Sequence, residues 1–138
     1  MRRYLVDTNV LSDLVKNADG LAARRTIEVG GSRSVYTSVV VVAEMRFGLA
    51  KKASGRLAAQ LELVLEQLTV APFSPPADRV YGDLRAELER RGTPIGANDL
   101  WIAAQALHDG SVLVTDNVSE FSRVPGLTVE NWLRPQAR

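Results

Sequence analysis

Acidic side chains stand at unusual places in this sequence, directly behind apolar segments. The apolar run 4–6 is followed at once by Asp7, and the run 112–114 leads in the same way to Thr115, Asp116 and Asn117. A carboxylate next to buried chain costs free energy unless a partner or a cation compensates its charge. These positions are therefore the first candidates for chemistry.

Two further acidic residues lie in apolar surroundings. Glu44 follows four valines and an alanine, and Asp99 comes just before the uncharged stretch 100–107. Clustered carboxylates repel one another, which raises their pKa values unless a cation joins them. Because the chain has no cysteine and one histidine, oxygen ligands favour Mg²⁺, or Mn²⁺, over Zn²⁺. Such an ion activates water and stabilises charge when a phosphodiester is cut.

Each acidic residue also has an explanation that involves no ligand. Asp7 can cap a helix that begins near Asn9, and Asp99 can stabilise the positive end of a helix dipole. Asp116 with Asn117 is a common turn pair, and Glu44 can form a buried salt bridge with an arginine. The occurrence of all four acids at the ends of predicted elements, or in apolar context, favours one shared site over four separate explanations.

The elements that must position these residues alternate along the chain. Short apolar runs predict strands, and apolar residues spaced by three and four predict helices. The valines of segment 39–52 favour a strand locally, but its apolar residues recur at helical spacing, so a helix is expected. Strands are expected at 3–7, 34–38, 70–73, 111–115 and 127–131, and helices at 9–16, 20–29, 39–52, 56–68, 76–91 and 98–109.

This alternation predicts an α/β fold with a central parallel β-sheet of four to five strands and helices on both faces. Ligands bind such sheets beyond the carboxyl ends of the strands. Asp7 and Asp116 would stand at that edge, and the first turn of the helix at 98–109 would bring Asp99 there. The length of 138 residues suits a single domain, residues 1–138, and 46% hydrophobic residues are enough for a core.

Composition excludes some classes of protein. A net charge of +1 neither requires nor excludes a nucleic-acid partner, so any basic surface must be local. The absence of cysteine excludes a disulfide framework and fits a reducing cytoplasm. No long apolar segment precedes Asp7, as a signal peptide would need, and the longest apolar run, 39–43, is too short to cross a bilayer. We expect a cytoplasmic protein with no membrane partner.

Four motifs carry a resemblance: "LVDTNVLSDL", "VVAEMRFGL", "PIGANDLWIAAQAL" and "VLVTDNVSEFSRVPGL". Taken together they resemble the PIN-domain ribonucleases, and most closely the VapC toxins of bacterial VapBC toxin–antitoxin modules, from Arg3 to Trp132. The resemblance implies a PIN fold and Mg²⁺-dependent endonucleolytic cleavage of RNA. It also implies a homodimer, a VapB-like antitoxin that blocks the site, and operator DNA bound by the complex mainly through that antitoxin.

The resemblance also implies roles for individual residues. The family's acidic positions fall on Asp7, Glu44 and Asp99, and its fourth position falls on Asn117 instead of Asp116, a departure that many relatives share. Asp7 and Asp99 would hold the principal Mg²⁺, while Glu44 would hold a second ion or orient the attacking water. Asp116 and Asn117 would complete the acidic ring, and which of the two helps to hold a metal stays open.

An RNA substrate has to reach this acidic pocket, so basic residues should surround it. The candidates lie on or just after the Glu44 helix, where a solvated helix end explains the same charges: Arg46, Lys51, Lys52 and Arg56. Thr8, Arg46 and Thr115 are expected to contact substrate, although Arg46 could equally bind the antitoxin or form an ion pair. Two of the motifs look most like the VapC subgroup that cuts initiator tRNA in its anticodon loop.

Three other functions fit part of the pattern. A housekeeping PIN nuclease in RNA processing would need no antitoxin, and a small gene just upstream would argue against it. A catalytically silent PIN-like binding module is disfavoured by the intact Asp7, Glu44 and Asp99. A receiver-type phosphotransfer domain also has an aspartate at a strand end, but here no acidic doublet follows the first strand and no suitable lysine follows a late one.

Overall fold

A computed structural model describes residues 2–135 of the chain. Strands and helices alternate in it, as the sequence predicts. Their order is β1 (Tyr4–Val6), α1 (Thr8–Lys16), α2 (Leu21–Glu28), the 3₁₀ turn η1 (Gly31–Arg33), β2 (Val35–Ser38), α3 (Val39–Lys52), α4 (Gly55–Glu66), β3 (Thr69–Ala71), α5 (Ala77–Arg90), α6 (Ala97–Asp109), β4 (Val112–Val114), α7 (Val118–Phe121) and β5 (Val129–Glu130).

The strands form one parallel sheet in the order β3-β2-β1-β4-β5. The chain moves outward from β1 through β2 to β3 and then returns to the other side of β1 with β4 and β5. The direction of winding therefore changes between β1 and β4. In open α/β sheets this switch point, beyond the carboxyl ends of the two strands, is where ligands bind.

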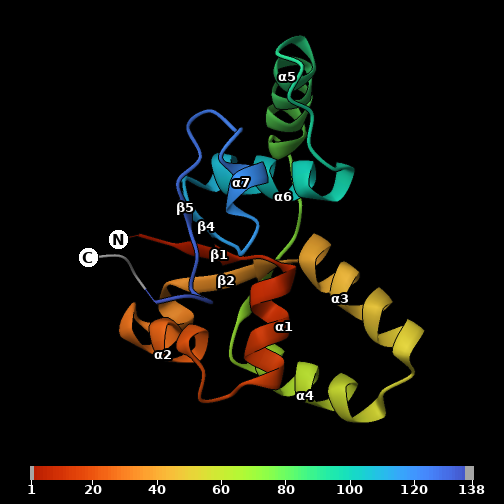
Figure 1. Cartoon of the computed structure of the whole chain (residues 1–138), viewed down its shortest axis with the longest axis vertical. Helices are drawn as coiled ribbons and strands as arrows, with labels where there is room; N and C mark the ends of the chain where they lie inside the picture. The colour runs from red at the N-terminus through yellow and green to blue at the C-terminus, as the bar shows by residue number, and fades with distance from the viewer. Residues whose placement is uncertain (1, 136–138) are drawn as a thin grey trace.

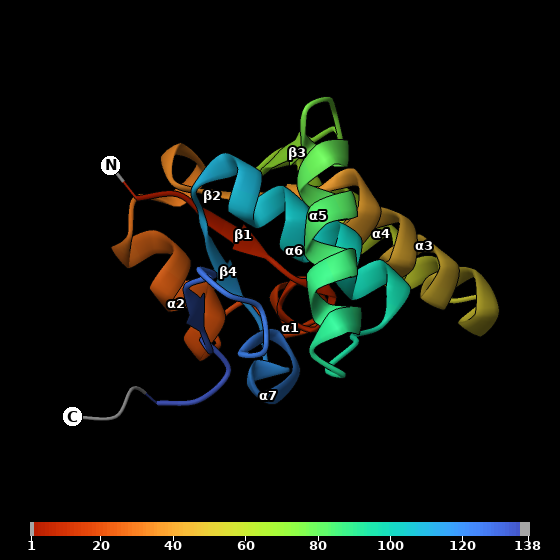
Figure 2. The same cartoon turned by 90° about the horizontal axis from the view of Figure 1, so that it is seen from above.

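Helices cover both faces of the sheet, as expected. Figure 1 shows α5 and α6 on one side and α1, α2 and α4 on the other, and Figure 2 shows α5 packed on the outside of α6. The central strands β1, β2 and β4 are buried along their whole length, which explains why they read as continuous apolar runs. Among the strands of residues 2–135, only the edge strand β3 is largely exposed.

The helix α3 forms despite its four valines. Its N-cap Ser38 accepts hydrogen bonds from the N–H groups of Val40 and Val41, which satisfies donors that the first turn leaves free. Val41, Val42, Met45 and Leu49 form its buried face. Tertiary packing of that face outweighs the β-propensity of valine. In Figure 1, α3 and α4 extend together to one side of the sheet.

All the predicted strands and helices are confirmed, with ends that differ by at most two residues. Two short elements were not predicted, η1 and α7. The helix α6 begins at Ala97, one residue before the predicted start, with Gly96 as its N-cap. No helix among residues 2–135 combines the length and apolarity needed to span a membrane.

Candidate active site

Asp7 lies at the switch point, directly after β1. It is the N-cap of α1, and its Oδ1 accepts a hydrogen bond of 2.7 Å from the N–H of Thr8. Its Oδ2 accepts a second bond, of 2.8 Å, from the hydroxyl of Thr115. Asp7 is 4% exposed, and burial raises its pKa against the opposing effect of these two bonds. Asp7 therefore both caps α1 and lies at the switch point, so the two explanations of this residue do not exclude each other.

Glu44 reaches the same place from α3. The hydroxyl of Thr8 donates a hydrogen bond of 2.7 Å to Oε1 of Glu44, and the side-chain amide of Asn98 donates one of 3.0 Å to Oε2. Among the described residues Glu44 has no cationic partner. The described residues therefore do not support the explanation of Glu44 as the partner of an arginine. Its charge is not compensated by a cationic side chain and remains available to a ligand in the pocket.

Asp99 enters from the first turn of α6. Burial is the main cause that raises its pKa to about 7, followed by repulsion from Glu120 and Asp7. A hydrogen bond between Asp99 and Glu120 favours the protonated form of Asp99 as well. Without a cation, Asp99 is therefore a carboxyl group that holds a proton near neutral pH.

Glu120 is an acidic residue that the sequence analysis missed. It accepts a hydrogen bond of 2.9 Å from the N–H of Gly96 and one of 2.6 Å from the side-chain amide of Asn117. These bonds, with the first as the larger cause, lower its pKa in spite of desolvation. The spacing Asn117-x-x-Glu120 is that of a capping pattern at a helix start, and this was the signal that could have revealed both α7 and Glu120.

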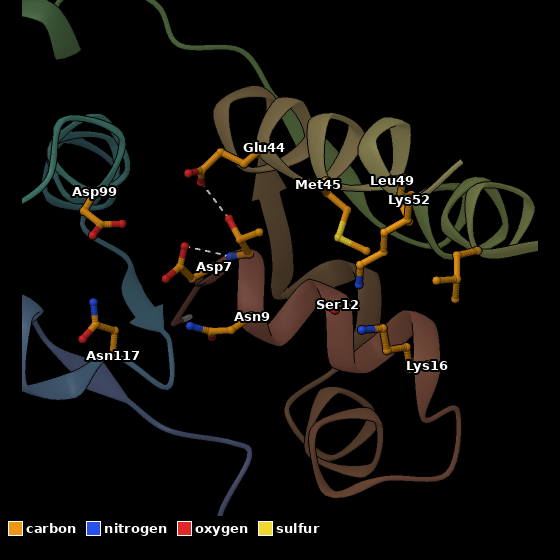
Figure 3. Close-up of a pocket in the computed structure, with 13 residues that line it drawn as sticks. Asp7, Asn9, Ser12, Lys16, Glu44, Met45, Leu49, Lys52, Asp99 and Asn117 are labelled. Atoms are coloured by element: carbon orange, nitrogen blue, oxygen red, sulfur yellow. Dashed lines mark hydrogen bonds between the residues drawn. The ribbon is translucent and has the colours of Figure 1, made fainter. Parts of the chain in front are cut away.

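One pocket of about 400 Å³ joins Asp7, Glu44 and Asp99. Figure 3 shows the side chains of Asp7, Glu44, Asp99 and Asn117 gathered at one end of it. Helix α1 contributes a run of polar side chains, and α3 and α4 contribute most of the rest. The lining residues are Asp7, Thr8, Asn9, Ser12, Lys16, Glu44, Met45, Gly48, Leu49, Lys52, Leu57, Asp99 and Asn117.

Some residues expected at the site do not line this pocket. Asp116 turns the other way: its carboxylate accepts a hydrogen bond of 2.9 Å from Asn131 and lies 3.7 Å from the guanidinium of Arg134. Arg46 binds Glu62 on α4 at 2.6 Å, because both lie on the exposed sides of their helices. Thr115 is fully buried and cannot contact substrate; its hydroxyl instead donates a hydrogen bond that positions Asp7. Of the basic candidates, Lys52 lines the pocket, whereas Lys51 and Arg56 do not.

The acidic end of the pocket suits a hard cation. Within residues 2–135 no three acidic or histidine side chains already form a metal-binding cluster. The available ligands are nevertheless carboxylate and amide oxygens, which Mg²⁺ and Mn²⁺ prefer. The raised pKa values of Asp7 and Asp99 come from burial and from neighbouring carboxylates, and a divalent cation would relieve both effects. Asp7 and Asp99 are the residues that fit such an ion.

This fold and this acidic switch point define a PIN domain, whose family model matches residues 4–127. The chain is 36% identical over 130 residues to "Ribonuclease VapC2" of Rickettsia felis, covering 94% of this chain and 97% of the relative. It is 35% identical over 133 residues to "tRNA(fMet)-specific endonuclease VapC" of Salmonella typhimurium, covering 96% and 99%. The structure of VapBC2 from Rickettsia felis bound to a DNA fragment from their promoter superimposes with a TM-score of 0.85 at 32% identity, covering 94% of this chain and 98% of the other.

The chain therefore belongs to the VapC ribonucleases of the PIN-domain family. This confirms the resemblance seen in the motifs, the α/β fold and the expected enzymatic class, an endoribonuclease. A receiver-type phosphotransfer domain is no longer a candidate.

Proposed function

We propose that this chain is a Mg²⁺-dependent toxin of a toxin–antitoxin module that cleaves initiator tRNA in its anticodon loop. The single observation that carries the proposal is the convergence of Asp7, Glu44, Asp99 and Asn117 on one pocket. The relative from Salmonella typhimurium, which bears the name of a tRNA(fMet)-specific endonuclease, supports this choice of substrate.

The residues of the pocket have distinct tasks in this proposal. Asp7 and Asp99 would hold Mg²⁺, or Mn²⁺ in its place, and such an ion would supply an activated water and neutralise charge on the scissile phosphate. Asp99 would release its proton to solvent on binding such a cation. Glu44, fixed by Thr8 and Asn98, orients the attacking water. Asn117, whose side-chain amide donates a hydrogen bond to Glu120, lies at the rim of the acidic end.

The partners follow from the relatives. The VapBC2 structure with promoter DNA supports a VapB-like antitoxin that blocks the site, and operator DNA as a partner of the complex. A homodimer and a cytoplasmic location complete the proposal. The bacterial source of the relatives agrees with this location.

The test is cleavage of total bacterial RNA by antitoxin-free protein, with Mg²⁺ or with EDTA. Wild type is compared with Asp7→Asn and with the control Asp83→Asn, which removes an exposed carboxylate on α5. A few discrete products that require Mg²⁺, disappear in Asp7→Asn and persist in Asp83→Asn are expected. Mapped ends in the anticodon loop of initiator tRNA identify the substrate.

Other outcomes contradict the proposal in different ways. Discrete cleavage ends in another RNA would support the nuclease activity but would exclude initiator tRNA as the substrate. No cleavage by folded wild-type protein favours the silent binding module. Cleavage without growth arrest on expression, and without relief by a neighbouring small gene product, favours a housekeeping nuclease. Circular dichroism of each variant shows that lost activity is not lost folding.

A further inference from the structure

The pocket has a second, basic end. Lys16 stands in the last turn of α1 and Lys52 in the last turn of α3, and both line the same pocket as Asp7 and Glu44. Figure 3 shows their side chains reaching toward one another beside Ser12, away from the carboxylates. The pocket is thus acidic where the strands end and basic where the two helices end.

Neither lysine has an anionic partner within residues 2–135. Arg46 on the same helix as Lys52, by contrast, is paired with Glu62. The C-terminal dipoles of α1 and α3 favour a cation at each position, but they do not remove the repulsion between two ammonium groups that face each other. An anion between the lysines would remove it, and the hydroxyl of Ser12 offers an additional hydrogen bond there.

Between the two ends, the wall of the pocket opposite the polar side chains of α1 is apolar. Met45, Leu49 and Leu57 form this part of the lining, and Met45 and Leu49 are buried. A ribose or a base packs against such a surface, whereas a second metal ion does not. Along the pocket, an acidic end is followed by an apolar wall and then by a basic end. This order matches a nucleic-acid strand, in which phosphates alternate with nucleosides.

We propose that Lys16 and Lys52 form a subsite for a backbone phosphate that flanks the scissile phosphate of the RNA. This inference rests on the proposed ribonuclease function and adds to it the path of the strand through the pocket. The flanking phosphate keeps its charge during the reaction, so the lysines stabilise bound substrate and transition state equally. Their loss raises KM and leaves kcat nearly unchanged.

The first experiment compares Lys16→Gln/Lys52→Gln with Lys51→Gln. Lys51 is adjacent in sequence, carries the same charge and lies over the ring of Phe47 at 5.0 Å, outside the pocket. In the double variant KM for the RNA substrate is expected to rise about 10-fold, since two exposed charge contacts are lost. The slope of log Kd against log salt concentration, measured in an Asp7→Asn background that binds without cutting, falls by about 1. Lys51→Gln changes neither value appreciably.

The second experiment removes the charge from the RNA instead. Single neutral methylphosphonates replace, one at a time, the phosphates next to the cleavage site. One of them is expected to weaken binding to the parent protein several-fold and to add nothing in Lys16→Gln/Lys52→Gln. Such coupling between one phosphate and the lysines distinguishes a subsite from a general loss of positive charge.

Failures of the two proposals are distinguishable. If wild type cuts no RNA, the proposed function fails. If wild type cuts RNA but the double variant has unchanged KM, unchanged salt dependence and the same response to every methylphosphonate, the subsite alone is refuted. A double variant with unchanged RNA binding but weakened binding of the antitoxin also refutes it, and assigns the lysines to the protein partner.

Discussion

Thr115 donates a hydrogen bond of 2.8 Å from its hydroxyl to Oδ2 of Asp7, which joins the carboxyl end of β4 to that of β1. The same hydroxyl accepts the N–H of Asn117 at 3.0 Å. The side chain of Thr115 is fully buried and does not line the pocket, yet it orients Asp7 and Asn117, which do. This bond also lowers the pKa of Asp7 and so opposes the larger effect of burial.

Replacement of Thr115 by valine removes this hydroxyl and keeps the shape of the side chain. The pKa of Asp7 then rises further, and divalent-cation affinity at pH 7 falls, because the cation competes with a more tightly held proton. We expect roughly 10-fold weaker Mn²⁺ binding by titration calorimetry and a comparable loss of cleavage, by analogy with the loss of outer hydrogen bonds at other metal sites. Thr115→Ser keeps the hydroxyl and should retain most of both. Equal affinities in the valine and serine variants would contradict this role.

The raised pKa of Asp99 predicts an unusual pH dependence of stability. Its pKa is about 7 in the folded protein, mainly because of burial, whereas the ordinary pKa of an aspartate is 3.8. Between these values the folded state binds the proton more strongly than the unfolded state, so this group makes the metal-free protein less stable as pH rises from about 4 to about 7. Asp99→Asn removes the effect, and its amide can donate to Glu120 as the protonated acid does.

We therefore expect metal-free Asp99→Asn to be inactive yet more stable than wild type at pH 8, and nearly equal to it at pH 4. Since Asp99 is only partly buried, solvent screens much of the repulsion, and the gain is on the order of 1 kcal/mol, or about 4 °C in Tm. Thermal unfolding in EDTA at the two pH values measures it. Added Mg²⁺ should stabilise wild type at pH 8 and leave the variant nearly unchanged. A variant that is less stable than wild type at pH 8 contradicts the assignment.

The sequence sufficed to predict the order of the main elements and the four polar side chains that meet at the acidic end of the pocket: Asp7, Glu44, Asp99 and Asn117. Parallel central strands are apolar throughout, so the positions at which Asp7 and Asn117 follow them stand out. The apolar spacing in segment 39–52 correctly predicted a helix, but it did not identify the buried face of α3: Val41, Val42, Met45 and Leu49 are buried, whereas Phe47 is 66% exposed. The features that were predicted depend on periodicity and burial, which a sequence shows directly.

Other features depend on side-chain direction and on contacts between distant segments. Lys16 and Lys52 are 36 residues apart, and only the packing of α1 against α3 brings them to one pocket. Glu120 belongs to a four-residue helix that is too short to show periodicity. Asp116 and Asn117 are neighbours, so their opposite directions are set by the turn after β4 and not by residue type.

That turn yields a paired prediction. Asn117 lines the pocket, whereas Asp116 binds Asn131 and approaches Arg134 on the outside. Asn117→Ala should lower kcat/KM at least 10-fold, because it removes a polar side chain from the acidic end of the pocket and breaks the hydrogen bond to Glu120. Asp116→Ala should change kcat/KM less than 3-fold, since its exposed contacts contribute little. Side-by-side cleavage assays at saturating Mg²⁺ measure both. The reverse order of effects would place Asp116 in the site.

Gly48 tests whether substrate passes along the α3 wall of the pocket. It lies in the interior of α3 and lines the pocket, and a Cβ built there meets no atom within 4 Å. Because glycine is a poor helix former, Gly48→Ala should stabilise the protein by about 0.5–1 kcal/mol and leave cleavage intact. Gly48→Leu should fold equally well, but its longer side chain would extend into the pocket and raise KM for RNA about 10-fold or more. Thermal unfolding and steady-state cleavage of the two variants separate stability from access, and a leucine variant that cleaves as well as the alanine variant would mean that the RNA takes another route to Asp7.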